Sequence, residues 1–424
     1  MQMQTIEKES AASVNWQLNG SFLLNPELRR KALDVLNNTA FPTTRTEAWK
    51  YTRVAKIKNS NLSIQENPVS LNGNYGLSAD NLQYVFINGH FSEELSSKSY
   101  PDGVKVLALS KMDEAEVRVL GGNVLLDGEV FSAINTAYAT DGLYVHVSAK
   151  MQIEPVIEIV QINTEKNILT NLRHVFVSEA FSEVKLIQRS ISVDGTDNFT
   201  NVVSEIHVGK NSKLTIDKLQ EEHESCFQIS TELVNQHQDS NFTINTVTLN
   251  GLLVRNNLTI EVDGRNCETH LNGAYILNGN QHVDNHTIVD HKVANCESNE
   301  LYKGVIDGKA TAVFNGKVFV RKDAQKINAF QSNANVLLSD DATINSKPEL
   351  EIYADDVKCS HGSTTGQLDE EAVFYLRARG LSEASARQLM VGAFIEDVIQ
   401  KIENEVFTDR IHTVLKERFN WVIE

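Results

Sequence analysis

Short β-forming segments separated by turn residues fill the chain from about Gln83 to Tyr353. Segments such as 143-LYVHVS and 202-VVSEIHVG are rich in Val, Ile, Thr and Phe, whereas Gly, Asn and Asp stand between them. Most of the chain is therefore predicted to be β structure. One helical interruption is predicted at Asp113–Val119 or slightly beyond, and little other helix inside this region.

The turn-then-strand units recur at a regular spacing. A flattened solenoid, with one strand on each of two faces per coil, gives a long step for a whole coil and a short step for half of one. An array of Ig-like sandwiches would break into similar domains of about 100 residues, which this sequence does not show. The spacing therefore predicts a mainly β fold, a parallel β-helix. The units begin at Ser212, Ser240, Cys267, Cys296, Ala310, Gln325 and Ala342, so that the steps are 28, 27, 29, 14, 15 and 17.

Helical segments are predicted on both sides of the β region. Asn25 and Pro26 form a cap and a first helical position, and apolar residues follow at helical spacing up to Leu36. A solenoid has an unpaired strand edge at each end, so we expect the helical segments to act as caps. The predicted division is an N-terminal helical domain (1–70), a β-helix core (71–360) and a C-terminal helical domain (361–424).

The C-terminal helices have clear boundary signals. Asp369 and two following glutamates place negative charge where the helix dipole favours it, and Gly380 is a plausible stop. Ser382 then caps a second helix that reaches Ile402, and a helical tail follows around Phe407–Phe419. The apolar stripes of these helices either pack inside the protein or form a groove for a partner, and the sequence leaves both alternatives open.

Charge and targeting signals exclude several classes of protein. The formal charge of −17 and the lack of a dense Lys/Arg cluster argue against a nucleic-acid partner. The basic run Arg29–Lys31 is interpreted as a solvated helix face. No secretory signal and no apolar run long enough for a membrane are visible, so we expect a cytoplasmic protein without a membrane partner. The four cysteines are expected to be reduced thiols.

Cys359 and His361 are the main candidates for metal chemistry. In an extended segment, residues two apart point to the same side, so the thiol and the imidazole would be neighbours. A nearby imidazolium lowers the pKa of a thiol, and both groups suit iron, copper or zinc. Two ligands do not complete a site, and an incidental pair at a strand end is the alternative.

Two further groups of metal-ligand residue types have structural alternatives. His282, Asp284 and His286 would share one face of a strand, which resembles a metal site, but exposed solenoid faces are normally polar. Cys267 and Cys296 occupy equivalent repeat positions, where a ladder of small buried side chains is the preferred interpretation. No CxxC pair, glycine-rich phosphate loop or GxSxG elbow is present, and the role of Cys226 is open.

Two longer motifs resemble those of a known protein family. The runs KPELEIYADDVKCSHG, from Lys347 to Gly362, and GQLDEEAVFYLRARG, from Gly366 to Gly380, closely resemble the C-terminal signature of the SufB/SufD family of iron–sulfur cluster assembly proteins. The CSHG form followed by GQLDEE favours the SufD branch. Weaker similarities upstream are VDNHT at 283–287, YKG at 302–304, FNGK at 314–317, AQK at 324–326 and the N-terminal EAWKY at 47–51.

The resemblance implies a right-handed parallel β-helix between helical caps. It also implies a non-catalytic scaffold, not an enzyme, that joins a SufB-like paralogue and a SufC-like ABC-type ATPase. The nascent iron–sulfur cluster would form at the SufB interface with His361 and its neighbour Cys359 taking part, and no cofactor would stay on this chain alone. A homodimer of the isolated chain is left open.

The resemblance further implies that the helices after the signature dock the ATPase, over Asp369–Gly380 and Ser382–Ile402. Two other interpretations remain: a β-helical polysaccharide lyase or hydrolase, and a purely structural solenoid. The residues expected at the ATPase interface are Asp369, Glu370, Glu371, Phe374, Tyr375, Arg377, Arg379, Gly380 and Phe394.

Overall fold

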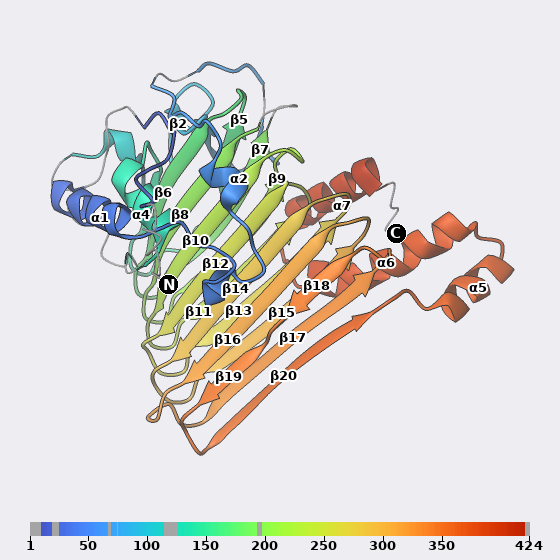
Figure 1. Cartoon of the computed structure of the whole chain (residues 1–424). Coiled ribbons are helices and arrows are strands. Elements are labelled where there is room, and N and C mark those ends of the chain that lie inside the picture. Colours follow the sequence, from blue (N-terminus) through green and yellow to red (C-terminus); the bar gives the residue numbers. More distant parts are fainter. Residues whose placement is uncertain are drawn as a thin grey trace, which may run out of the picture.

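Two long β-sheets face each other and form the body of the molecule in the computed structural model (Figure 1). Helices lie beside this body near both ends of the chain (Figure 1). The structure describes residues 10–18, 25–66, 69–73, 75–113, 126, 128–192 and 197–419.

The first sheet consists, in spatial order, of β2 (His90–Ser92), β1 (Leu82–Ile87), β5 (Ile157–Asn163), β7 (Glu183–Ser192), β9 (Lys213–Glu221), β11 (Asn241–Thr248), β13 (Glu268–Leu277), β15 (Glu297–Ile306), β17 (Ile327–Leu337) and β20 (Val357–Gly366). The second consists of β18 (Thr343–Ser346), β16 (Thr311–Val320), β14 (His282–His291), β12 (Leu253–Val262), β10 (Phe227–Gln236), β8 (Phe199–Val208), β6 (Leu169–Ser178), β4 (Leu143–Val147) and β3 (Val104–Ala108), and β19 (Glu349–Ile352) also pairs with β16. From β5 to β18 the chain alternates between the sheets.

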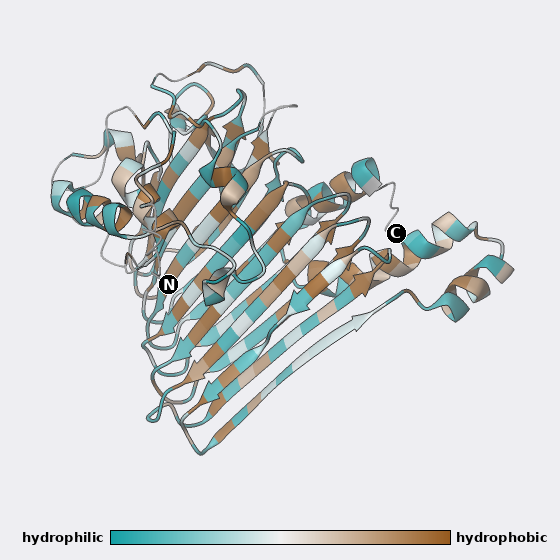
Figure 2. Cartoon of the chain, viewed as in Figure 1, coloured by the Kyte–Doolittle hydropathy of each residue, from teal (hydrophilic) through white to brown (hydrophobic). Residues whose placement is uncertain are grey.

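Each coil of the chain therefore contributes one strand to each sheet, and neighbouring coils pair in parallel. Lys213, Asn241, Glu268 and Glu297 are register partners on successive strands of the first sheet. These partners are the first strand residues of the units whose steps of 28, 27 and 29 were read from the sequence. The predicted parallel β-solenoid is confirmed. Figure 2 shows hydrophilic and hydrophobic residues alternating along many of its strands.

The turns that precede these strands share one conformation. Each contains a residue with a positive φ, which Asn and Asp adopt more readily than most L residues. A small side chain follows and is buried where the coils stack. The positive-φ residues are Asn211 (56°), Asp239 (59°), Asn266 (58°) and Asn295 (63°), and the buried residues after them are Ser212, Ser240, Cys267 and Cys296. The predicted ladder of small buried side chains is confirmed for Cys267 and Cys296.

The N-terminal helices pack at the side of the second sheet. They are α1 (Pro26–Asn38), η1 (Glu47–Trp49) and α2 (Ala55–Lys58). The predicted cap of α1 is correct, because Oδ1 of Asn25 accepts a hydrogen bond from the backbone N–H of Glu27 at 2.8 Å. Trp16, Leu36 and Trp49 form an apolar cluster with residues at the starts of β6 to β12.

A buried helix inside the β region was not predicted. This helix, α4 (Val130–Tyr138), packs against α1, β6 and β8, and eight of its residues are buried. Its sequence VFSAINTAY is short and mostly apolar, so periodicity alone does not separate it from a short buried strand. The short helix η2 (Leu109–Lys111) precedes it. The predicted helix at Asp113–Val119 lies, apart from Asp113, outside the described residues.

The C-terminal helices are α5 (Glu370–Ala378), α6 (Glu383–Ile399) and α7 (Glu405–Phe419). Of these, α6 and α7 pack on the outer face of the first sheet, and α5 packs on α6. Ile395 of α6 and Phe407 of α7 are buried against sheet residues such as Leu219 and Val247. Nζ of Lys303 on β15 forms an ion pair with Asp397. Figure 1 shows α5 projecting away from the sheets.

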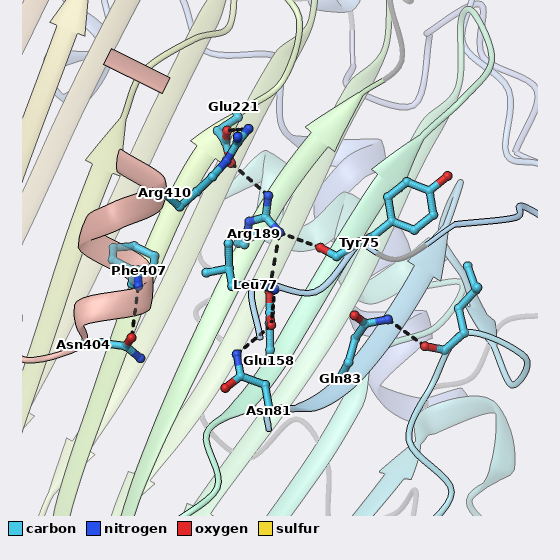
Figure 3. Close-up of polar contacts among 11 residues, drawn as sticks. Tyr75, Leu77, Asn81, Gln83, Glu158, Arg189, Glu221, Asn404, Phe407 and Arg410 are labelled. Carbon is cyan, nitrogen blue, oxygen red and sulfur yellow. Dashed lines mark hydrogen bonds and ion pairs between the residues drawn. The ribbon is translucent and has the colours of Figure 1, made fainter. Parts of the chain in front are cut away.

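Buried charges join the two terminal regions to this sheet (Figure 3). Arg189 on β7 contacts Glu158 at 3.5 Å and Glu221 at 3.3 Å, and it donates to the carbonyl of Tyr75 at 2.6 Å. Arg410 on α7 approaches the same Glu221 at 2.5 Å. An N-terminal loop, two strands and the last helix are therefore connected through one set of carboxylates and guanidinium groups.

The flanking helices are confirmed, but they do not cover the last coil as we expected of caps. They pack on sheet faces and at the side of the solenoid, and β20 is left exposed along most of its length. The predicted boundary between 360 and 361 falls inside β20, which runs to Gly366. The division into three domains otherwise stays a prediction. No helix in the described ranges is both long and apolar enough to cross a membrane.

The burial of α6 predicts unequal effects of two similar substitutions. Ile395 is fully buried against the sheet, whereas Leu389 on the same helix is 44% exposed. Ile395→Ala should lower the free energy of unfolding by about 2–5 kcal/mol, because it leaves a cavity. Leu389→Ala, the control, should change it by about 0.5 kcal/mol or less. Urea denaturation measures both, and equal effects would contradict this packing.

Candidate functional site at the open end of the solenoid

The strand β20 forms an exposed edge at the C-terminal end of the solenoid. Among the described strands of the first sheet it pairs with β17 alone, so its other side has unpaired backbone N–H and C=O groups. Every residue from Ser360 to Gly366 is exposed. Figure 2 colours much of this part of the strand as intermediate in hydropathy. Such an edge is available for pairing with another chain.

Cys359 and His361 lie on the inward side of β20, as predicted for residues two apart. Their register partners on β17 are Ala329 and Gln331. Ser363, on the same side of β20, reaches across to the second sheet, where its hydroxyl lies 2.8 Å from that of Ser346 on β18. We call the inward-facing residues Cys359, His361, Ser363 and Ser346 the mouth of the solenoid.

His361 ends a row of inward-facing residues that crosses the first sheet. The row is apolar over the middle coils and becomes polar near the mouth. Oε1 of Glu300 accepts from the hydroxyl of Thr287 at 2.5 Å, and Oε2 accepts from Nε2 of Gln331 at 2.8 Å. In register order the row is Leu186, Ile216, Ile244, Leu271, Glu300, Gln331 and His361.

Gln331 occupies a tight place between Glu300 and the mouth. Its side chain is 4% exposed, and within the described residues its Oε1 has no hydrogen-bond partner. Gly316 on β16 makes room for it, because a Cβ at that position would lie 2.5 Å from Nε2 of Gln331. A buried carbonyl oxygen is thus available next to His361 in the register.

Desolvation dominates the electrostatics of this region. Burial raises the pKa of the Cys359 thiol, so the lowering that we expected from a neighbouring imidazolium is not found. Burial also raises the pKa of Glu300 to about 7, against the opposing hydrogen bonds from Thr287 and Gln331. Both groups therefore favour their neutral forms in the isolated chain.

Cys359 and His361 provide a soft sulfur and a nitrogen, which are ligand types that suit iron. Within the residues that the structure describes, no group of three or more His, Cys, Asp or Glu side chains is placed to hold a metal ion. The mouth by itself can therefore supply part of a coordination shell.

The residues around His282 and the residues around Trp49 contact one another and form one structural unit. The sequence did not predict this contact. The Thr52 hydroxyl donates to Asp284 at 2.5 Å and lies 2.8 Å from Nε2 of His282. Arg255 pairs with Asp284, and its guanidinium stacks over the ring of Trp49 at 3.8 Å. This set of contacts holds the N-terminal segment on β12 and β14.

The same segment also contacts the chain beside the mouth. Nζ of Lys347, between β18 and β19, lies 3.0 Å from Glu47 and 3.2 Å from Glu349. We call all of these contacts the clasp; its members are Glu47, Trp49 and Thr52 on the N-terminal segment and Arg255, His282, Asp284 and Lys347 on the solenoid. His286 lies 3.3 Å from Asp284, and burial lowers its pKa to about 4. The structural interpretation of these histidines is therefore favoured over a metal site.

The remaining cysteines are free thiols in the interior. Cys226, Cys267 and Cys296 are buried, and Cys359 is half-buried. Sγ of Cys267 donates to the carbonyl oxygen of His237 at 3.0 Å, and Sγ of Cys296 donates to that of Gly264 at 3.3 Å. These contacts are those of packed structural thiols.

The predicted docking residues mostly lie on α5 and at its ends. Asp369 caps the helix, because its Oδ1 accepts from the backbone N–H of Glu371 at 2.9 Å and of Ala372 at 3.2 Å. Gly380 has a φ of 104°, as expected of a helix stop. Phe374 is 72% and Tyr375 is 55% exposed.

Ion pairs fasten α5 to α6. Glu370 lies 2.7 Å from Arg387, and Arg377 lies 3.2 Å from Glu383. Arg379 stacks on Tyr375 at 4.6 Å. Phe394 is placed differently from the rest, because it is half-buried against the sheet with Nζ of Lys303 4.5 Å from its ring.

Comparison with known proteins gives matches along most of the chain. The family model for the SufBD core domain of SUF-system iron–sulfur cluster assembly matches residues 160–394, and the model for the SufBD N-terminal region matches residues 17–159. An iron–sulfur cluster assembly SufBD family protein of Synechocystis is 34% identical over 402 residues, which are 90% of this chain and 88% of that protein. SufD of Escherichia coli is 27% identical over 394 residues, covering 91% of each chain. The chloroplastic protein ABCI7 of Arabidopsis thaliana is 30% identical over 410 residues, 92% of this chain and 85% of that protein.

The raised pKa of Glu300 predicts a specific pH dependence of stability. An unfolded glutamate has a pKa of about 4.3, so between about 4.3 and 7 the folded chain holds a proton that the unfolded chain has lost. This contribution to stability is fully present below about pH 4.3 and is lost as pH rises through 7. Glu300→Gln should remove that loss, so the variant should gain stability relative to the native chain as pH rises. Urea titrations between pH 5 and 8 measure this.

Glu297→Gln is the matched control for Glu300→Gln, because Glu297 is exposed at the start of the same strand. The stability of the Glu297→Gln variant should change with pH in the same way as that of the native chain. Parallel curves for all three proteins would show that the carboxyl of Glu300 ionises as an ordinary glutamate.

Proposed function

Since the chain belongs to the SufBD family of iron–sulfur cluster assembly proteins, we propose that it is the SufD-type, non-catalytic scaffold subunit of a cluster assembly complex. In this proposal it joins a SufB-like paralogue through the mouth and a SufC-like ABC-type ATPase through the C-terminal helices. The iron–sulfur cluster is the cargo of the complex and is not a resident cofactor of this chain.

The observation that carries the proposal is the exposed edge of β20 with His361 and Cys359 on its inward side. An unpaired parallel edge can accept a strand from another chain, with backbone hydrogen bonds providing affinity. The expected occupant is the paralogue, because a related solenoid would present an edge of similar length. A homodimer of the isolated chain would use the same edge.

The incomplete ligand set agrees with a shared site. Iron in protein-bound clusters is generally held by thiolates, in some centres with histidines. The mouth offers one imidazole and one thiol, so further ligands must come from the partner across the interface. Because burial keeps the thiol of Cys359 protonated, its use as a ligand requires deprotonation, which metal binding would drive. A divided site also lets the cluster leave when the interface changes.

The surface of α5 suits a partner protein. Monomeric proteins rarely expose a group of large apolar side chains without a function, and Phe374, Tyr375, Leu381 and Leu389 are all exposed on α5, on α6 or between them. In the proposed complex the ATPase docks here and transmits its motion through α6 to the first sheet. No observation favours the polysaccharide lyase or hydrolase.

Replacing His361 tests the proposed cluster site. In the reconstituted complex, His361→Ala should lower the iron and sulfide bound per complex by about tenfold or more, because a ligand is lost. Ser360→Ala is the control, since Ser360 lies on the opposite side of the same strand and should leave the yield unchanged. Gel filtration checks that both complexes assemble. Normal cluster formation in an intact His361→Ala complex would reject the role of this residue.

Truncating two exposed aromatic residues tests the docking surface. The double variant Phe374→Ala and Tyr375→Ala should bind the ABC-type ATPase of the same organism about tenfold more weakly or worse, because buried aromatic anchors dominate such interfaces. Tyr100→Ala removes a 44% exposed aromatic before β3 and should not change the affinity. Calorimetry provides the dissociation constants, and undiminished affinity of the double variant would place the ATPase elsewhere.

A further inference from the structure

The N-terminal segment concentrates positive charge on an acidic protein. Between residues 45 and 58 the chain has five cationic side chains and a single carboxylate, that of Glu47, while the whole chain has a formal charge of −17. The cations stand three to five residues apart in part of this stretch, so they do not form a run in the sequence. They are Arg45, Lys50, Arg53, Lys56 and Lys58.

The cationic side chains of residues 45–58 differ from those of α1 in whether carboxylates of the chain pair with them. On α1, Arg30 pairs with Asp34 at 3.4 Å and Lys31 pairs with Glu27 at 3.1 Å, so carboxylates on the same helix offset these cations. Within the described residues, the guanidinium groups of Arg45 and Arg53 form no ion pair, and the single carboxylate of Glu47 is engaged by Lys347 of the clasp. The positive charges of Arg45 and Arg53 are therefore available to a ligand.

A groove of about 940 Å³ runs between the end of α1, the loop at 39–46, η1 and α2. Arg45, Arg53 and Lys58 line it, and we call it the basic groove. Among the described residues that line it, Glu129 is the one carboxylate, and burial raises the pKa of that group. The remaining lining contains threonine and asparagine residues together with apolar residues such as Phe41, Pro42 and Val54.

The clasp holds one wall of the basic groove in place. Trp49 is 4% exposed beneath Arg255, and Thr52 is fully buried on Asp284 and His282. Arg45 and Arg53 flank these two anchored residues in the sequence. The two cations are consequently mounted on a fixed backbone, which lowers the entropy that binding would cost.

We propose that the basic groove binds an acidic segment of a partner polypeptide. Carboxylates of such a segment pair with Arg45 and Arg53, and its backbone N–H groups can donate to the asparagine side chains of the lining. A nucleic-acid backbone has phosphates but few donors, so it fits this lining less well.

The distant acidic surface of the chain does not prevent this binding. At physiological ionic strength the Debye length is about 8 Å, so the charges that line the groove outweigh carboxylates elsewhere. This interaction surface is separate from the mouth and from α5, and the inference does not rest on the proposed cluster function.

Peptide binding by the full-length chain tests the inference. The probe is a short fluorescein-labelled peptide in which Glu alternates with Ala, and its counterpart has Gln at each Glu. Fluorescence anisotropy should show binding of the Glu peptide that weakens with added salt, and little binding of the Gln peptide. The double variant Arg45→Glu and Arg53→Glu should bind the Glu peptide about tenfold more weakly or worse.

Two matched variants complete the experiment. Lys309→Glu with Lys322→Glu reverses two exposed charges at turns of the solenoid, so net charge changes equally and binding should be retained. Arg45→Gln with Arg53→Gln should also lose affinity, and circular dichroism confirms the fold of each variant. Failure of the native chain to bind the Glu peptide, equal binding of the Gln peptide, or full affinity in the Arg45 and Arg53 variants would overturn the inference. Tighter binding of a single-stranded RNA would assign the groove to nucleic acid instead.

Discussion

In-register stacking of one coil on the next determines the rest of this structure. Parallel pairing satisfies the backbone groups of each strand only through its neighbours, so side chains at equivalent positions form rows that cross every coil. One row is apolar at Leu186, Ile216, Ile244 and Leu271, and it stabilises the interior. The same row then reaches His361 at the last strand. A single register thus builds the core and places an imidazole at the open end.

The segments outside the coils are attached to them by buried charges. Arg189 on the first sheet lies between Glu158 and Glu221, and Arg255 on the second sheet lies between Asp284 and the ring of Trp49. A buried guanidinium is costly unless its partners are well placed, so each arrangement admits few alternative positions of the attached segment. The outer faces of the sheets are therefore specific docking surfaces for the chain's own termini, whereas the edge of β20 is left for another molecule.

The sequence predicted what depends on local chemistry or on a regular period. The solenoid followed from the spacing of strand starts, and the helix boundaries at Asn25, Asp369 and Gly380 followed from capping residues whose effect extends over one turn. Features that depend on distant pairing were missed. Thr52 contacts Asp284 although 232 positions separate them, and α4 is a short, mostly apolar segment whose type depends on what it packs against.

The candidate site shows the same limit. Placing Cys359 and His361 on one side of a strand required only the two-residue period of β structure. The polar end of their row, with Glu300 and Gln331, was not visible, because it depends on which coil lies next to which. Nor did the sequence show that the helices leave the last edge uncovered, since a helix cap and a helix on a sheet face have the same amphipathic pattern.

The clasp also has a consequence for the order of events during synthesis. Glu47 pairs with Lys347, which is 300 positions away in the chain, and the contacts of Trp49 and Thr52 require residues of β12 and β14. A ribosome releases the N-terminal segment long before those coils exist, so this segment cannot reach its final place until nearly the whole solenoid has formed. Its docking therefore reports that the coils up to Lys347 have formed, and a chain that ended before Arg255 would leave Trp49 without that guanidinium partner.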